Sequence, residues 1–352
     1  MYFLNIQEMS FLKTFGKNPS GRELDKVKES PQYRNGIFNN LSETTLMLQK
    51  TSFLKMMWRF MNKAAYTKPP KKLPSVISDL KYPGYRHPFI VWFGHSSYLI
   101  HIADMNILVD PVLSGHASPF SFTAMSFKGS DIYTTGDLPE IDMLILTHDH
   151  YDHLDYKTIL SLKSKTKKIY TSLGVASHLL YWGIDKKIIS EFDWWQSEKI
   201  NANLELIALP ARHFSGRTFA RNKTLWSSFI LETSTHSIYI GADSGYDTHF
   251  SKIGERFGPI DIAILESGQY NEAWPEIHMM PEQTVQAAID LRAKVLLPVH
   301  WGKFALAFHP WDEPVKRVKA KARELGVTIT TPMIGEPVII DSTYPQKDWW
   351  EF

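Results

Sequence analysis

The chain has 352 residues, 43% of them hydrophobic, and a formal net charge of +2, a composition typical of a globular protein with one large or two ordinary domains. The near-neutral charge gives no indication of a nucleic-acid-binding protein. The sequence contains no cysteine, which excludes disulfides, thiolate metal ligands and cysteine nucleophiles, so any metal must be bound by histidine and carboxylate side chains.

No segment has the features of a secretion signal or a membrane span. The opening MYFLNIQEMSFLKTFGKN lacks a basic start followed by a long apolar stretch, and no run of about 18 uncharged apolar residues occurs. We therefore expect a cytoplasmic protein, which could also associate peripherally with the inner membrane surface.

Residues 1–85 form a predicted N-terminal extension, which is polar and interrupted by prolines. Within it, residues 44–72 contain seven basic residues and no acidic one. Their apolar residues follow helical spacing and predict a basic amphipathic helix: Leu46, Phe53, Met56, Met57, Phe60 and Met61. Three uses are open: an interfacial helix that enters a bilayer, a helix packed on the main domain with its basic face in water, or a homodimer contact.

Residues 86–352 form the predicted main domain, and their short apolar runs, rich in Val, Ile, Phe and Tyr, are typical of strands. The runs are HPFIVWFGHSSYLIHI, NILVDPV, DMLILTH, KKIYTS, LELIALPA, SFILETS, HSIYIGAD, DIAILES and KVLLPVH. Helical patterns lie between several of them: YKTILSLKS, MPEQTVQAAIDLRA, which has Pro281 and Glu282 at its start after Met280, and EPVKRVKAKARELG, which ends at Gly326. Because strands and helices do not strictly alternate, we expect a mixed α/β fold of stacked sheets covered by helices.

The segment THDHYDHLD, Thr147–Asp155, concentrates potential metal ligands directly after an apolar strand. His148 and His150 are two residues apart, so an extended backbone points both side chains to one side, where they can bind one ion. Asp152 and His153 precede the next helix and could serve a second ion. We call each of these pairs of residues a half-site. Each half-site needs further ligands from elsewhere in the chain, since a zinc ion in a protein usually has four or five ligands.

Three more strands end in residues of the ligand type. LELIALPARH ends in His213, HSIYIGAD in Asp243 and KVLLPVH in His300. Ligand sites of open α/β sheets lie at the carboxyl ends of strands. The alternative is a set of histidines satisfied by hydrogen bonds, but this convergence favours a metal site.

These seven residues, in this order, resemble the metallo-β-lactamase superfold of two-metal hydrolases. The resemblance implies an αβ/βα four-layer sandwich of two packed mixed β-sheets flanked by helices. It also implies two Zn²⁺ ions, although manganese and iron can share such nitrogen and oxygen ligands. One ion would be bound by His148, His150 and His213 and the other by Asp152, His153 and His300, with Asp243 bridging the two.

Further segments are similar to the branch that contains the N-acylphosphatidylethanolamine-hydrolysing phospholipase D enzymes and the ascorbate-phosphate lactonases. They include WFGHSSYLI, LVDPVLSGHASP, EFDWWQSEKI, LPARHFSGR, GADSGY and HWGKFAL. The phospholipase D side is the more similar. The resemblance implies a phosphodiesterase that releases N-acylethanolamine and phosphatidic acid, with a metal-bridging hydroxide as nucleophile.

The expected catalytic residues are Asp152 and His278. His278, in PEIHMMPEQT, is a candidate proton donor to the leaving group because its ordinary pKa is near 6.5 and it lies just before a helix N-terminus. The alternative is a histidine of a surface loop.

Other family-like residues have structural interpretations. We expect His95 and Asp110 to orient metal ligands or stabilise turns. Ser96 and Ser97 lack the GxSxG context of a serine nucleophile. We expect the paired Trp194 and Trp195 in the core. Three residues close in sequence to predicted ligands could line the pocket without an assigned role: Tyr246, Asp247 and Phe304.

Two other functions are open. A lactonase or phosphoesterase for a small polar metabolite would have a narrow polar pocket. A membrane-surface binding protein on a hydrolase scaffold is the other, although the complete ligand set argues against it. We expect no nucleic-acid partner, because no RNA-binding domain or extended basic and aromatic surface is evident.

Overall fold

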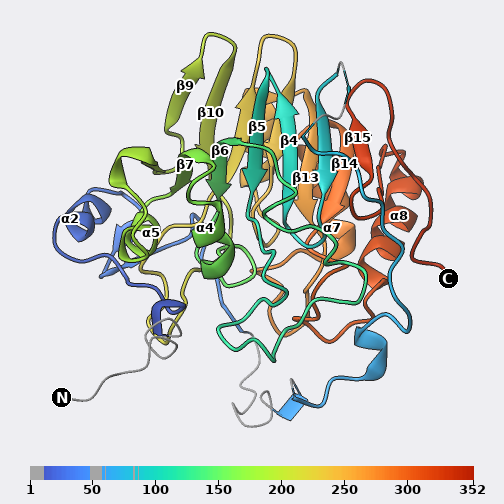
Figure 1. The fold of residues 1–352 in the computed structure, drawn as a ribbon, viewed down its shortest axis with the longest axis horizontal. Coiled ribbons are helices and arrows are strands. Elements are labelled where there is room, and N and C mark those ends of the chain that lie inside the picture. Colours follow the sequence, from blue (N-terminus) through green and yellow to red (C-terminus); the bar gives the residue numbers. More distant parts are fainter. Residues whose placement is uncertain (1–11, 48–57, 60, 82–83, 86) are drawn as a thin grey trace.

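The computed structural model describes residues 12–47, 58–59, 61–81, 84–85 and 87–352. Its centre is a pair of mixed β-sheets (Figure 1). The first has seven strands in the order β15 (Pro337–Ile339), β3 (Phe89–Trp92), β4 (Tyr98–Ile102), β5 (Met105–Val109), β6 (Ile141–Leu146), β7 (Thr166–Ser172) and β8 (Ile189–Phe192). Strands β5 to β8 are parallel to one another, and the other pairs are antiparallel.

The second sheet has six strands in the order β14 (Ala293–Val299), β13 (Ile260–Glu266), β12 (Ser237–Ile240), β11 (Ser228–Glu232), β10 (Leu204–Leu209) and β9 (Ser197–Asn201). Strands β12, β13 and β14 are parallel, whereas β9 to β12 are antiparallel. The parallel strands of each sheet deliver their carboxyl ends to one edge of the sandwich.

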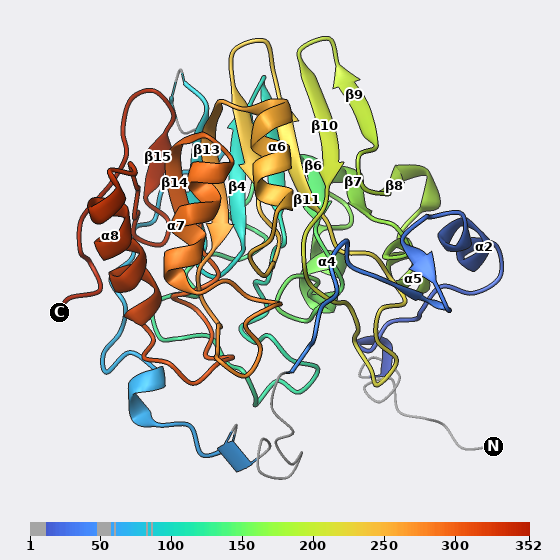
Figure 2. The same cartoon turned by 180° about the vertical axis from the view of Figure 1, so that it is seen from behind.

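Successive side chains of a strand point to opposite faces of the sheet and so divide the core into layers. In β6, Met143 and Ile145 join the cluster between the sheets, whereas Leu144 and Leu146 pack on the outer side. The outer side of the first sheet is covered by α4 (Tyr156–Leu162) and α5 (Ala176–Tyr181), and that of the second by α6 (His249–Phe257), α7 (Pro281–Asp290) and α8 (Glu313–Leu325) (Figures 1 and 2). The expected four-layer sandwich is therefore confirmed.

The helix boundaries follow their sequence signals. Helix α7 begins at Pro281, where the missing N–H costs no helical hydrogen bond. Helix α8 ends before Gly326, whose φ of 68° is the left-handed conformation that glycine adopts most easily. Within the described ranges, no helix is both long and apolar enough to cross a bilayer.

The N-terminal segment packs on the sandwich through α2 (Arg22–Lys28) and the hairpin of β1 (Tyr33–Arg34) and β2 (Ile37–Phe38). Val27 and Phe38 are completely buried against Trp226 of the main domain. The backbone N–H of Lys17 donates to His178 Nδ1 at 2.9 Å. The boundary that we predict at residue 85 stays a prediction, but residues before it share one core with residues after it.

The predicted amphipathic helix lies mostly outside the described residues, because 48–57 and 60 are not among them. Residues 58, 59 and 61 are helical. The Arg59 guanidinium lies 4.4 Å from the ring centroid of Phe308, and Lys63 donates to the carbonyl of Ala305. Trp58 and Met61 are 61% and 74% exposed. In this part the basic side chains contact the domain and the apolar ones face solvent, the reverse of a helix packed with its basic face in water.

Candidate metal centre

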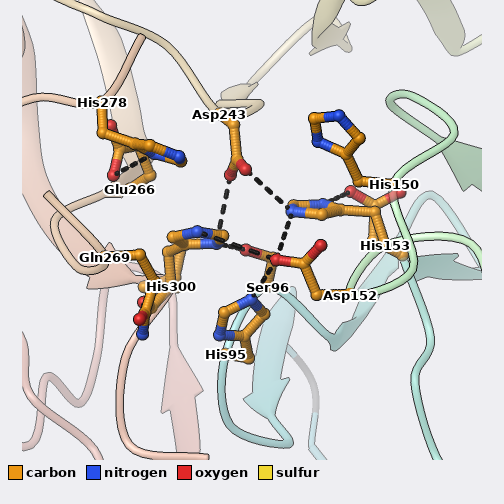
Figure 3. A network of polar contacts seen from close by, with 12 residues as sticks. His95, Ser96, His150, Asp152, His153, Asp243, Glu266, Gln269, His278 and His300 are labelled. Atoms are coloured by element: carbon orange, nitrogen blue, oxygen red, sulfur yellow. Dashed lines mark hydrogen bonds and ion pairs between the residues drawn. The ribbon is translucent and has the colours of Figure 1, made fainter. Parts of the chain in front are cut away.

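The seven predicted ligands lie together, at the carboxyl ends of β6, β10, β12 and β14. Figure 3 labels five of them: His150, Asp152, His153, Asp243 and His300. Each ligand lies in the loop that follows its strand. There the backbone no longer pairs with a neighbouring strand, so the side chain can point across the edge of the sheet. Five of the seven side chains are at most 2% exposed: His148, His153, His213, Asp243 and His300.

The first group contains His148, His150, His213 and Asp243, whose donor atoms all lie within 4.8 Å of one another. His150 Nδ1 is 2.9 Å from His148 Nε2 and 3.2 Å from His213 Nε2. Three imidazole nitrogens thus meet at one point, with the carboxylate of Asp243 beside them. This is the set that the sequence predicts for one ion.

The second group contains His95, Asp152, His153 and His300. Asp152 Oδ2 lies 3.6 Å from His153 Nε2 and 4.0 Å from His300 Nε2. His95 Nε2 is 2.9 Å from the same oxygen, which agrees with the expectation that His95 orients a ligand. Apart from His95, this is the set predicted for the second ion.

Asp243 lies between the two groups. Its Oδ2 is 3.7 Å from His213 Nε2 in the first group and 3.2 Å from His153 Nε2 in the second. Its Oδ1 is 3.1 Å from His300 Nδ1. One carboxylate therefore contacts both half-sites, as a bridging ligand requires.

Unsatisfied buried atoms test whether these residues fit a metal ion. His153 Nε2, His300 Nε2 and Asp243 Oδ1 are buried, and the polar atoms near them among the described residues are not oriented to form hydrogen bonds with them. A buried polar atom without a partner is costly. A divalent cation between the groups would satisfy all three, so the donor set fits a metal that prefers nitrogen and oxygen ligands.

The protonation states also suit a cation. Burial lowers the pKa of His148, His213 and His300 well below the usual value, so their imidazoles are neutral and can bind a metal. Burial raises the pKa of Asp243, but the neighbouring His153 and His300 outweigh it and hold that pKa well below the usual range. Burial would lower the pKa of His153, but Asp243 and Asp152 outweigh it and raise that pKa well above the usual value, so this imidazole would give up a proton to a bound cation. Neutral nitrogens around an anionic carboxylate are the form that a metal ion needs.

A surrounding layer of hydrogen bonds orients the ligands. Asp110 Oδ2 lies 2.8 Å from His153 Nδ1, and the Asp110 carboxylate also accepts from the Thr147 N–H at 2.8 Å. These contacts agree with the orienting role that we predict for Asp110. Ser96 Oγ lies 2.8 Å from His300 Nδ1. Such contacts fix the ring orientation and the tautomer of a metal-binding histidine.

His95 and His300 also meet through their backbones. His300 donates its N–H to the carbonyl of His95, and His95 donates to the carbonyl of Trp301, both at 2.9 Å. Both histidines adopt the left-handed region, with φ of 55° and 67°. This conformation costs energy in residues with a Cβ and is typical of functional loops.

His278 lies beside the metal centre and not in a surface loop. Its ring centroid is 5.0 Å from that of His213 and 5.3 Å from that of His300. Its Nδ1 is 3.7 Å from Oε2 of the buried Glu266 (Figure 3). Burial raises the pKa of Glu266 to about 7. Burial also lowers the pKa of His278, but the Glu266 carboxyl more than offsets this effect, so the pKa of His278 is raised.

Glu266 is not among the residues predicted from the sequence. Its signal was nevertheless visible, since Glu266 is the last residue of β13 and follows the run DIAIL as the metal ligands follow theirs. A buried glutamate at the carboxyl end of a strand, in a sheet that already supplies ligands, is a candidate site residue.

Two clefts open from the metal centre. Cleft A has a volume of about 270 Å³. The residues that line cleft A and not cleft B include Leu46, Met47, Trp274, Ile277 and His278. Cleft B has a volume of about 680 Å³. The residues that line cleft B and not cleft A include Phe15, Ala117, Tyr151, Thr218 and Phe219. Both clefts share five residues: His150, Asp152, Phe214, Arg221 and Leu306.

Several nearby residues lie away from these clefts. The Tyr246 hydroxyl donates to Asp290 at 2.5 Å, and Phe304 is buried against the ring of His95. Asp247 lies 3.9 Å from Arg212. The expectation that Tyr246, Asp247 and Phe304 could line the pocket is therefore wrong for clefts A and B.

The paired tryptophans differ from each other. Trp194 is buried and donates its indole N–H to the Trp226 carbonyl at 2.8 Å, as expected for a core residue. The same prediction is wrong for Trp195, which is 36% exposed and lies under the guanidinium of Arg256 at 5.4 Å. Its φ of 72° turns the side chain out of the core.

Comparison with known proteins agrees with this geometry. Residues 105–301 match the family described as the beta-lactamase superfamily domain. An uncharacterized protein of Mycobacterium tuberculosis is 37% identical over 330 residues, which cover 92% of this chain and 88% of that protein. The N-acyl-phosphatidylethanolamine-hydrolyzing phospholipase D 1 of Caenorhabditis elegans is 29% identical over 230 residues, 62% of this chain and 65% of that protein.

A solved structure shares the fold. The metallo hydrolase Igni18 of Ignicoccus hospitalis superposes with a TM-score of 0.57 at 18% identity, over 73% of this chain and 99% of that one.

Proposed function

The chain belongs to the beta-lactamase superfamily as a metal-dependent hydrolase, and from this premise we propose that it is a phosphodiesterase of the phospholipase D type. Its substrate would be N-acylphosphatidylethanolamine or a similar phospholipid. The observation that carries the proposal is that two clefts with mainly apolar walls meet at the metal centre. A small polar metabolite would need one narrow polar pocket. The similarity to the Caenorhabditis elegans phospholipase adds support.

In this proposal the two groups of side chains hold two metal ions, with zinc as the first choice. His148, His150 and His213 would hold one ion, Asp152, His153 and His300 the other, and Asp243 would contact both. Divalent ions in such a site polarise the phosphoryl group and lower the pKa of water towards neutrality.

The chain's own residues would orient the substrate and move a proton. His278 lines cleft A next to the metal centre, within reach of a leaving oxygen. The Glu266 carboxyl, 3.7 Å from His278, raises the pKa of His278 and so favours its protonated form. Water attacks the phosphorus, the bond from phosphorus to the ethanolamine oxygen breaks, and that oxygen receives the proton of His278. The products are N-acylethanolamine and phosphatidic acid.

We also propose that the cleft mouths face a lipid surface. Met47 of cleft A is 42% exposed, and Phe219 of cleft B is fully exposed. Trp58 and Met61, in the described part of the basic segment, present their apolar side chains to solvent as well. Exposed aromatic and apolar side chains beside basic residues are typical of proteins that bind the membrane interface.

The decisive experiment incubates the purified full-length protein with vesicles that contain N-palmitoyl phosphatidylethanolamine. Metal is first removed with a chelator and then restored as Zn²⁺, Mn²⁺ or Fe²⁺. We expect release of N-palmitoylethanolamine only after metal is restored. The absence of this product with all three metals would contradict the proposal, and turnover of a small lactone instead would favour the lactonase alternative.

A further inference from the structure

We infer that the two clefts divide the substrate at its scissile bond: cleft A receives the N-acyl arm that leaves, and cleft B receives the diacylglycerol arm that stays on the phosphate. This inference rests on the proposed function and deepens it. It assigns each half of the lipid to a named surface of the protein.

The position of His278 sets the direction. A proton donor must lie on the side of the leaving oxygen, within hydrogen-bond reach. His278 lines cleft A and is not part of the lining of cleft B. In a phospholipase D reaction the leaving oxygen belongs to N-acylethanolamine, so the N-acyl chain extends into cleft A.

The size and lining of the clefts agree with this direction. Cleft A, about 270 Å³, is the smaller and has Leu46, Trp274 and Ile277 along its wall, which suits a single acyl chain. Cleft B, about 680 Å³, is more than twice as large and suits two chains. Phe15, Ala117 and Phe219 give it apolar contacts. Apolar walls stabilise acyl chains in proportion to the area that they remove from water.

Arg221 lies where the two clefts meet. Its guanidinium is 5.2 Å from the ring centroid of Phe214, and both side chains line both clefts. Among the described residues, no carboxylate lies within ion-pair distance of Arg221. A guanidinium without an acidic partner can bind an anion, and the phosphodiester is the only charged part of a lipid that would lie at this junction.

The atoms of the reaction balance in this orientation. The oxygen of water forms a new bond to phosphorus and its displaced proton goes to solvent, while the bond to the ethanolamine oxygen breaks. His278 protonates that oxygen and is reprotonated from solvent. N-acylethanolamine then leaves through cleft A, and phosphatidate leaves through cleft B.

A pair of matched variants tests the assignment. Met47 of cleft A and Thr218 of cleft B are both exposed, so Met47→Trp and Thr218→Trp narrow one cleft each without disturbing the core. Ile77→Trp, at a position that is 80% exposed and outside both clefts, is the control. Two substrates in detergent micelles separate the arms: one has a long N-acyl chain and short glycerol chains, and the other has a short N-acyl chain and long glycerol chains.

We expect a crossed pattern in kcat/KM. Met47→Trp should lower the value for the long N-acyl substrate on the order of tenfold and leave the other substrate within about twofold, and Thr218→Trp should do the converse. The reverse pattern, or equal losses on both substrates, would overturn the assignment while the phospholipase activity stands. If the unaltered protein hydrolyses neither lipid, the proposed function fails and this inference fails with it.

Discussion

Asn40 holds the backbone of His213 from both sides. Its side-chain Oδ1 accepts from the His213 N–H at 3.0 Å, and its Nδ2 donates to the His213 carbonyl at 2.8 Å. The same oxygen accepts from the Trp226 indole at 3.0 Å, which fixes the amide plane. A residue of the N-terminal segment therefore positions a predicted metal ligand 173 positions away in the sequence.

Replacement of Asn40 should weaken metal binding. In Asn40→Ala both hydrogen bonds to the His213 backbone are lost, so the imidazole is held less firmly. Loss of contacts that orient a metal ligand typically costs about 10- to 100-fold in metal affinity. Chelator competition, followed by measurement of bound metal, checks this expectation independently of activity.

Asn39 provides the matched control. Its side chain donates to the carbonyls of Gln32, Arg34 and Ile37, in and next to the β1–β2 hairpin, and makes no hydrogen bond to His213. Asn39→Ala should lower the melting temperature and leave metal affinity unchanged. Equal metal affinity in Asn40→Ala and Asn39→Ala would show that Asn40 does not position the ligand.

Removal of Arg221 should impair the binding of anionic substrates. Arg221→Ala is expected to raise KM for a phosphodiester with little change in kcat, because hydrogen bonds to charged groups contribute about 1.5 to 3 kcal/mol, roughly 10- to 100-fold. The KM of Arg221→Lys should lie between that of the unaltered protein and that of Arg221→Ala. In the unaltered protein KM should rise with ionic strength, and this dependence should be weaker in Arg221→Ala.

Arg256→Ala is the control for this prediction. Arg256 also lies over aromatic rings, at 5.4 Å from Trp195 and 5.0 Å from Phe257, but it lines neither cleft. The Arg256→Ala variant should therefore have the same KM for a phosphodiester as the unaltered protein. A comparable rise of KM in both variants would indicate a general effect of net charge and not a contact of Arg221 with substrate.

Replacement of His278 should slow the hydrolysis of substrates whose leaving group needs a proton. His278→Asn is expected to lower kcat on N-acylphosphatidylethanolamine by about 10²- to 10⁴-fold, since it removes general-acid catalysis. Bis(p-nitrophenyl) phosphate has a leaving group that departs as a stable anion, so its hydrolysis should be much less affected. Glu266→Gln should show the same selectivity to a smaller extent.

Bound metal must be measured in the same samples, because the donor atoms of Asp243, His278 and His300 also lie within 4.8 Å of one another. Unchanged metal content with a selective loss supports proton donation by His278. An equal loss on both substrates together with a loss of metal would assign His278 to metal binding instead.

The cluster of seven candidate metal ligands was predictable because its signal is local. His148 to His153 follow one apolar strand, and His213, Asp243 and His300 follow three others, so strand ends alone bring the seven residues to one edge. The helix boundaries at Pro281 and Gly326 were likewise predictable from residue type. These features depend on residues that are neighbours in sequence.

Contacts between distant segments could not be predicted in this way. Asn40 has no sequence feature that indicates a partner 173 residues later. Strand β9 was also missed, because SEKIN has no apolar run and its residues alternate only between exposed and half-buried, as befits the edge of a sheet. The exposure of Trp195 depends on a backbone conformation that tryptophan rarely adopts.

A last prediction concerns stability and pH. His249, at the start of α6, is 3% exposed, and its ring centroid is 4.0 Å from that of Phe250. Burial outweighs the nearby Asp247 and lowers the pKa of His249 to about 4. The unfolded chain takes up a proton near pH 6.5, whereas the folded protein does not until about pH 4, so the free energy of unfolding falls as pH decreases between these values.

His249→Gln removes this titration and keeps a polar side chain near Ser244. The free energy of unfolding from urea titrations at pH 7.5 and 4.5 should therefore fall less in the variant than in the unaltered protein, by up to about 3 kcal/mol. The difference between the two proteins cancels the contribution of the metal-centre histidines, which both share. Parallel pH dependence in the two proteins would show that His249 is not the buried neutral histidine that its environment indicates.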